Sequence, residues 1–280
     1  MTWVSAMMIA LIVFIHLPVV DAGWYGAWRK WGVDGICRLG VPWFFFASGV
    51  YFARHIGECD GWYGREIRKR VSSLLVPYFV LNLIWFPCVV TMNWIGTKCF
   101  NYPANVTLSL EWIVRGVGLS PVNMPIVIPL WFLRALFVVV VVGGLVWKFL
   151  RRNVWSGLAV AVACWGLYVV RLTWCPQDGQ FFYYGLNVQG LALFMSGVCL
   201  SPLLIAKTKS PGISGLRNAV WAIFVLHAPI ISLMLIPFKV CGGQKAFANP
   251  FCYFSCWLGV LVLSLVLGRV LRVDRLRKLV

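Results

Sequence analysis

The chain has 280 residues, of which 61% are hydrophobic and 12% charged, and its mean hydropathy is +0.84. Soluble domains average roughly 25% charged residues, so this composition excludes an ordinary water-soluble fold. The 16 tryptophans exclude intrinsic disorder. The formal net charge of +17 comes from 25 Lys and Arg against 8 Asp and Glu, a bias typical of cytoplasmic loops in membrane proteins. No basic segment alternates with aromatic residues, so nucleic acid is not expected as a partner.

The predicted elements are eight apolar segments bounded by polar residues, glycine or proline. In chain order they cover residues 2–20, 39–54, 71–95, 126–147, 153–172, 184–206, 218–238 and 250–271. Each is long enough to cross a bilayer with some tilt. We therefore predict an all-α fold, a polytopic transmembrane helix bundle of about eight spans, with eight to ten as the range. Residues 1–280 are expected to form a single integral-membrane domain, because no linker or repeat divides them.

Lysine and arginine are distributed unequally between alternate loops. Sixteen of them lie in one set, namely 54–70, 148–152, 207–217 and the tail from Arg269. Eight lie in the other set, at 21–38, 96–125, 171–183 and 239–249. The positive-inside rule places the richer set in the cytoplasm, and an even number of spans then places both termini there as well.

The ten cysteines form no CxxC pair. No metal site is therefore predicted. Most of these cysteines are expected to pack as small hydrophobic residues. Those in or beside the outward loops are candidates for disulfides: Cys99, Cys175, Cys241 and Cys252.

Ionisable residues inside the spans are candidates for function, because hydrocarbon disfavours charge. None of the eight acidic residues falls inside a predicted span, which argues against an ion-coupled transporter. His16, late in the first span, is either a neutral general base or a hydrogen-bonded residue of the bundle. Arg134, at the outward end of the fourth span, either snorkels to the interface or binds an anion or polar substrate. His227, just before Pro229, is either a core residue or a substrate contact.

Basic residues cluster at the start of the third span: Arg65, Arg68, Lys69 and Arg70. One interpretation is a topology signal that also contacts anionic membrane lipids. The other is a clamp for a phosphorylated cytosolic ligand, because arginine binds phosphate through two hydrogen bonds. In the aromatic second span, Ser48 and Gly49 form a small pair that favours close helix packing.

Several stretches taken together resemble the acyltransferase-3 family of integral-membrane O-acyltransferases. In chain order they are the histidine at 16, VPWFFFASG, RKRVSSLLVPY, PLWFLRALF and IFVLHAP, which ends at about residue 229. The resemblance implies an enzyme that transfers an acyl group, expected to be acetyl, from cytosolic acyl-CoA to a hydroxyl of a cell-surface or lipid-linked carbohydrate. It also implies a multi-pass protein of the bacterial cytoplasmic (inner) membrane, with one acyltransferase-like domain over 1–280.

The resemblance is carried over at His16, Arg70, Tyr78, Trp131 and His227. Taken together with the charged and small residues described above, it predicts His16 as the catalytic base. Acetyl-CoA, which is a substrate here rather than a resident cofactor, is expected at Arg65, Arg68, Lys69, Arg70 and Tyr78. The acceptor is expected at Ser48, Trp131, Arg134 and His227. Family members often carry an arginine eleven residues before the first-span histidine, where this chain has Ser5.

Two rival interpretations remain beside the enzyme. A small-solute exporter or flippase is disfavoured by the absence of membrane carboxylates and of internal repeats. A catalytically inactive relative is favoured by Ser5.

Overall fold

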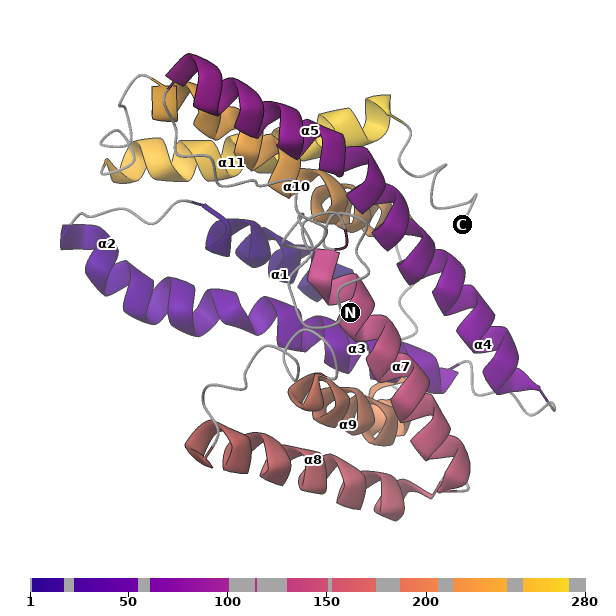
Figure 1. Ribbon diagram of the computed structural model, residues 1–280. Coiled ribbons are helices and arrows are strands. Elements are labelled where there is room, and N and C mark those ends of the chain that lie inside the picture. Colours follow the sequence, from indigo (N-terminus) through magenta and orange to yellow (C-terminus); the bar gives the residue numbers. More distant parts are fainter. Residues whose placement is uncertain are drawn as a thin grey trace. The chain divides into compact units, whose positions relative to one another are not determined.

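The computed structural model describes residues 2–17, 23–54, 61–100, 114, 130–150, 153–174, 187–205, 214–240 and 249–271. Helices make up nearly all of these residues, and no strand occurs among them (Figure 1). This confirms the predicted all-α fold.

Every predicted span contains a helix. The helices are α1 (Thr2–Ile15), α3 (Gly40–Arg54), α5 (Val76–Phe100), α7 (Trp131–Phe149), α8 (Val154–Trp174), α9 (Val188–Ile205), α10 (Ser214–Val240) and α11 (Pro250–Val270). Five helical stretches in the described residues are long and apolar enough to cross a membrane: Gly23–Arg54, Trp62–Cys88, Trp131–Phe149, Val154–Arg171 and Pro250–Val270. Shorter apolar helices lie at Trp3–Ile15, Val188–Leu204 and Asn218–Met234. These helices fit a membrane bundle, while the exact number of spans and the side of the termini stay predictions.

Two stretches that the sequence analysis treats as loops are helical. α2 (Gly23–Trp28), the π-helical segment η1 (Arg29–Ile36) and the 3₁₀ segment η2 (Cys37–Leu39) run directly into α3. Likewise, α4 (Trp62–Arg70) and the π-helical segment η3 (Val71–Leu75) run directly into α5.

The loop predictions were wrong because charged residues were taken as signs of irregular backbone. On these helices the charges form ion pairs within one or two turns. Arg38 lies 2.9 Å from Asp34, and Arg70 lies 2.8 Å from Glu66, both at a spacing of four residues. Such pairs support a helix rather than interrupt it.

The chain divides into two compact units. Unit 1 comprises Met1–Phe44 and Ser210–Leu279, and unit 2 comprises Phe45–Lys209 with Val280. The prediction of a single domain remains an expectation.

In unit 1, α1 packs against α10 and α11. The Trp257 indole on α11 donates a hydrogen bond to the Ala10 carbonyl oxygen at 2.9 Å. Gly40 meets α1 closely, because a Cβ atom there would lie 2.6 Å from Ile12 Cγ1. Among the disulfide candidates, Cys252 on α11 has a free thiol; the other three side chains lie outside the described part of the chain.

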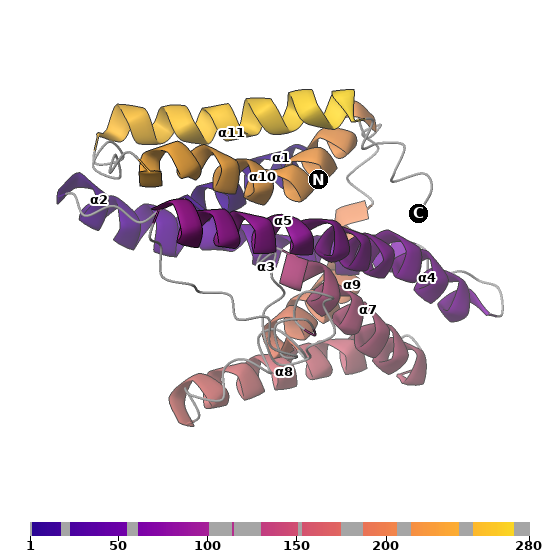
Figure 2. The same cartoon turned by 45° about the horizontal axis from the view of Figure 1, so that its top comes forward.

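In unit 2, α8 packs against α9, and Figure 2 shows α9 rising from the side of α8. The backbone of α9 in turn comes close to that of α3. A Cβ atom at Gly49 would collide with the Phe194 carbonyl oxygen, and one at Gly197 would collide with the Phe46 carbonyl oxygen. Only glycine leaves room for this approach, which is the packing that the Ser48-Gly49 pair favours.

We expect Gly197→Ala to lower the stability of the purified protein by about 1–3 kcal/mol, since the added methyl group would push α3 and α9 apart. Gly166→Ala on α8 is the matched control, because a Cβ atom at Gly166 meets nothing within 4 Å. Thermal unfolding in detergent compares the two variants. Equal unfolding temperatures would contradict the close crossing.

Candidate active site

Two histidines of unit 1 lie in ring contact. His16 directly follows α1 and His227 lies on α10, with their ring centroids 5.1 Å apart and their planes at 72°. His16 Nδ1 lies 2.8 Å from the Ile12 carbonyl oxygen, and His227 Nδ1 lies 2.9 Å from that of Ile223. A carbonyl oxygen only accepts hydrogen bonds, so each Nδ1 carries the proton. In the neutral rings, each Nε2 therefore keeps its lone pair.

The two histidines differ in access. His227 is 0% exposed, and its Nε2 has no hydrogen-bond partner among the described residues. His16 is only partly buried. His16 is therefore the more accessible of the two rings.

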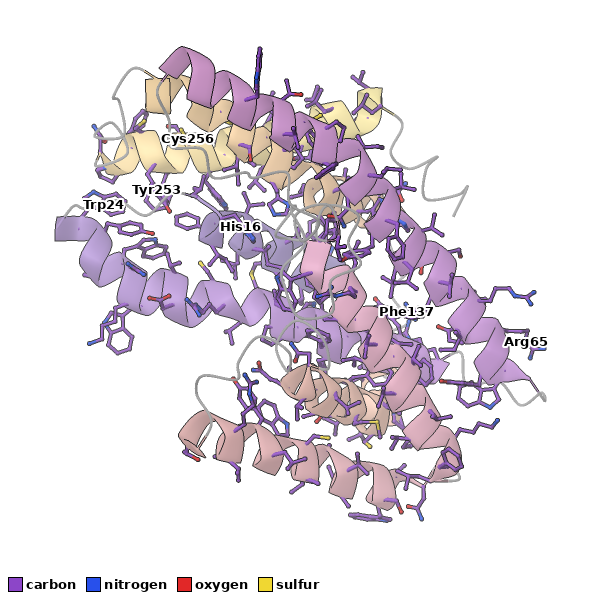
Figure 3. All side chains as sticks on the ribbon, viewed as in Figure 1. His16, Trp24, Arg65, Phe137, Tyr253 and Cys256 are labelled. Carbon is purple, nitrogen blue, oxygen red and sulfur yellow. The ribbon has the colours of Figure 1, made fainter. Side chains whose placement is uncertain are left out.

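An aromatic cluster surrounds the end of α1 that leads to His16. Its centre is Phe14, whose ring centroid lies 5.6 Å from that of Trp28, 5.3 Å from that of Tyr253 and 5.6 Å from that of Trp257. Trp24 on α2 also meets Tyr253, at 5.7 Å, and Figure 3 shows these two side chains together with His16. The sequence analysis did not single out this cluster. The sequence feature that could have indicated it is the density of aromatic residues in 24–31 and 251–257.

In unit 2, the basic residues of α4 fall into two groups. Arg65, Arg68 and Lys69 are exposed, and Figure 3 shows Arg65 near the N-terminal end of α4. The Arg70 side chain is 19% exposed and donates through Nε and Nη2 to the Glu66 carboxylate, at 2.9 and 2.8 Å. The four cations are therefore not equivalent, because the charge of Arg70 is already balanced.

Glu66 corrects one premise of the sequence analysis, which places every acidic residue outside the spans. The Glu66 side chain is 4% exposed and lies in Trp62–Cys88, a stretch long and apolar enough to cross a membrane. Its pairing with Arg70 is what allows this burial. The missing-carboxylate argument against a transporter therefore does not hold for this residue.

Tyr78 and Arg134 meet within unit 2. Tyr78 is buried on α5, and the Arg134 guanidinium on α7 donates a hydrogen bond to its hydroxyl. A second contact joins the same two helices, because the Tyr63 hydroxyl donates a hydrogen bond to the Val141 carbonyl oxygen at 2.8 Å. Tyr63 precedes Tyr78 in the chain, whereas Val141 follows Arg134, so the two helices run antiparallel. The sequence analysis assigns Tyr78 to the donor and Arg134 to the acceptor, and the structure brings the two residues together.

The remaining predicted site residues of unit 2 are largely packed. Ser48 and Trp131 are both buried. The Trp131 ring meets the Phe132 ring at 6.3 Å, and Phe132 meets Phe45 at 5.1 Å. Asn82, one turn after Tyr78, is a buried polar residue that the sequence analysis missed. The signal for it was a lone amide in an apolar span.

Comparison with known proteins decides the family. The acyltransferase-3 family model, described as an acyltransferase domain, matches residues 2–280. The chain belongs to the acyltransferase-3 family. It is therefore an acyltransferase, and its apolar helices make it an integral membrane protein. Comparison with curated proteins and with solved structures gives no significant match.

In this acyltransferase, Ser5 has a structural partner. The Trp43 indole on α3 donates a hydrogen bond to the Ser5 hydroxyl at 3.2 Å. Position 5, where the sequence analysis expects a family arginine, thus carries a neutral side chain that links α1 to α3. Among the described residues, no group of three or more His, Cys, Asp or Glu is placed to hold a metal ion.

Proposed function

We propose that this acyltransferase moves an acetyl group from cytosolic acetyl-CoA to a hydroxyl of a cell-surface or lipid-linked carbohydrate, in a bacterial cytoplasmic membrane. The family match supports acyl transfer. The exposed cations of α4 support a donor that carries phosphate groups. The excess of Lys and Arg in the loop set that includes 54–70 supports their placement in the cytoplasm.

The observation that carries the proposal is the tautomer of His16. Its Nδ1–H is held by the Ile12 carbonyl oxygen, so Nε2 is the nitrogen that accepts a proton. The acceptor hydroxyl gives its proton to Nε2, and its oxygen attacks the thioester carbonyl carbon. The carbon–sulfur bond then breaks, and coenzyme A leaves as the thiol after taking the proton back from Nε2. A thioester is already reactive, so positioning and one base suffice.

On the donor side, we assign Arg65, Arg68 and Lys69 to the phosphates of acetyl-CoA. Arg70 holds Glu66 and so acts as a positioning residue for this helix. Tyr78 lies further along the same helix and completes the donor site.

On the acceptor side, we assign Arg134 to a polar group of the carbohydrate, since the residue is only partly buried. Ser48 and Trp131, the other two residues of unit 2 assigned to the acceptor, are buried. His227 supports His16 through their ring contact.

Release of coenzyme A tests the enzyme class. Purified protein in detergent is incubated with acetyl-CoA and a glycan acceptor, and free thiol is measured over time. We expect thiol release that depends on the acceptor. If no thiol is released with any acceptor tested, the chain would be a catalytically inactive relative, in which Ser5 cannot perform the role of the arginine expected at that position.

We also predict that α4 faces the cytoplasm. Gly64 on α4 is exposed and a Cβ atom there meets nothing within 4 Å, so Gly64→Cys should fold normally. In intact cells, a membrane-impermeant maleimide should leave this cysteine unlabelled, and permeabilised cells should label it. Strong labelling of intact cells would invert the topology and remove the cytosolic donor site.

A further inference from the structure

One face of the continuous helix formed by α4, η3 and α5 is buried and yet polar. Its members recur every four residues: Glu66, Arg70, Leu74, Tyr78 and Asn82. Side chains spaced four residues apart move gradually around an α-helix, because one turn holds only 3.6 residues. A π turn holds more residues and therefore brings such side chains back toward one face. The π-helical segment η3 lies in the middle of this repeat. Leu74 is its one apolar member, in a chain that is 61% hydrophobic.

The polar side chains of this face form ion pairs or hydrogen bonds, and one atom of Asn82 forms none among the described residues. Glu66 pairs with Arg70, and Tyr78 accepts from Arg134. Asn82 is 0% exposed, and its Nδ2 donates to the Tyr78 carbonyl oxygen at 2.8 Å. Asn82 Oδ1 is buried and has no hydrogen-bond partner among the described residues.

The orientation of the Asn82 amide follows from its neighbour. If the amide were flipped, Oδ1 would face the Tyr78 carbonyl oxygen, and two acceptors would meet. The open position is therefore an acceptor, and it needs an N–H or O–H from elsewhere. The bond that Nδ2 makes goes to a backbone carbonyl of its own helix, so it links Asn82 to no second helix.

We infer that Asn82 binds the pantetheine arm of the acyl donor, with Oδ1 accepting a hydrogen bond from a secondary amide N–H of that arm. The inference rests on the proposed function. The amide is neutral, which suits a face where Glu66 and Arg70 already balance each other.

The length of the helix fits this placement. Arg68 and Asn82 are separated along the same continuous helix by about 20 Å at a rise of 1.5 Å per residue. An extended coenzyme A spans a comparable distance between its phosphates and its arm. The donor then lies along one continuous helix, with its phosphates at Arg65, Arg68 and Lys69 and its arm at Asn82.

Three probes separate the two ends of the donor. Acetyl-CoA carries both ends, S-acetylpantetheine carries only the arm, and adenosine 3′,5′-bisphosphate carries only the nucleotide. Binding of each is measured on purified protein for wild type, Asn82→Leu and Arg68→Gln. We expect Asn82→Leu to weaken acetyl-CoA and S-acetylpantetheine about 5- to 10-fold, the value of one neutral hydrogen bond, and to leave the bisphosphate unchanged. Arg68→Gln should weaken the bisphosphate and spare S-acetylpantetheine.

Stability provides the second readout. A ligand-binding Asn82 predicts that Asn82→Leu unfolds at the same temperature as wild type or higher, because a buried open acceptor is removed. A lower unfolding temperature together with weaker binding of all three probes would show a structural role and overturn the inference. Asn82→Ala serves as the second variant if the leucine prevents folding.

The remaining outcomes separate the inference from the function on which it rests. Wild type that binds acetyl-CoA while Asn82→Leu and Asn82→Ala bind it equally well would overturn the role of Asn82 alone. Wild type that binds none of the three probes would overturn the acyl-CoA donor, and the role of Asn82 with it.

Discussion

Replacing His16 by alanine is expected to lower kcat/KM for acyl transfer by roughly 100- to 10,000-fold, the usual contribution of a general base. The acceptor proton then has no destination when its oxygen attacks the thioester. Acetyl-CoA binding and expression should be retained, because donor binding is assigned to the cations of α4 and not to His16. Thiol release with saturating donor and with acceptor well below its KM measures the change in kcat/KM.

Glutamine at position 16 distinguishes a base from a structural histidine. A glutamine amide can still donate to the Ile12 carbonyl oxygen, which His16 Nδ1 contacts at 2.8 Å, but it cannot take up a proton. His16→Gln should therefore fold like wild type and be nearly as inactive as His16→Ala. The same substitution at His227, whose Nδ1 makes the equivalent bond to Ile223, is the matched control. Near wild-type transfer by His16→Gln together with loss of transfer in His227→Gln would reverse the assignment of the base.

Arg68→Gln and Arg70→Gln are expected to fail in different ways, although the two residues lie one turn or less apart. Arg68 is exposed, so its loss should leave stability unchanged and weaken acetyl-CoA binding by about 10- to 100-fold, as one charge-assisted contact to phosphate does. Arg70→Gln leaves the buried Glu66 carboxylate without its partner and should destabilise the protein by about 3 kcal/mol. Titration with acetyl-CoA and thermal unfolding in detergent measure the two effects.

A double variant controls for the buried charge. In Glu66→Gln/Arg70→Gln, neither charge is present, and much of the lost stability should return. The double variant should also bind acetyl-CoA nearly as well as wild type. A double variant that is stable but no longer binds acetyl-CoA would return Arg70 to the set of residues that contact the donor.

The long apolar segments could be predicted from the sequence, because a helix in hydrocarbon must satisfy its own backbone and cover it with apolar side chains. The close crossing at Gly49 could also be anticipated from the small Ser48-Gly49 pair. The helical stretches before α3 and α5 could not. Their charges, such as Asp34 with Arg38, resemble a loop until the ion pairs at a spacing of four residues are seen.

The candidate site was only partly predictable. His16 and His227 are each identifiable as ionisable residues in apolar spans, but their ring contact joins positions far apart in the chain. The hydrogen bond from each Nδ1 to its own helix, which decides the tautomer, has no signature in sequence. Asn82 was missed because one amide in an apolar span is unremarkable until its neighbours on the same face prove to be polar as well.

Mass spectrometry of cell-surface glycans tests the central claim most directly. Cells that express the wild-type chain, His16→Gln or neither are compared at matched amounts of protein in the membrane. We expect acyl esters on the glycans with the wild-type chain, and none above background with His16→Gln. Acyl esters at the wild-type level with His16→Gln would contradict the base, and their absence with the wild-type chain would contradict the carbohydrate acceptor.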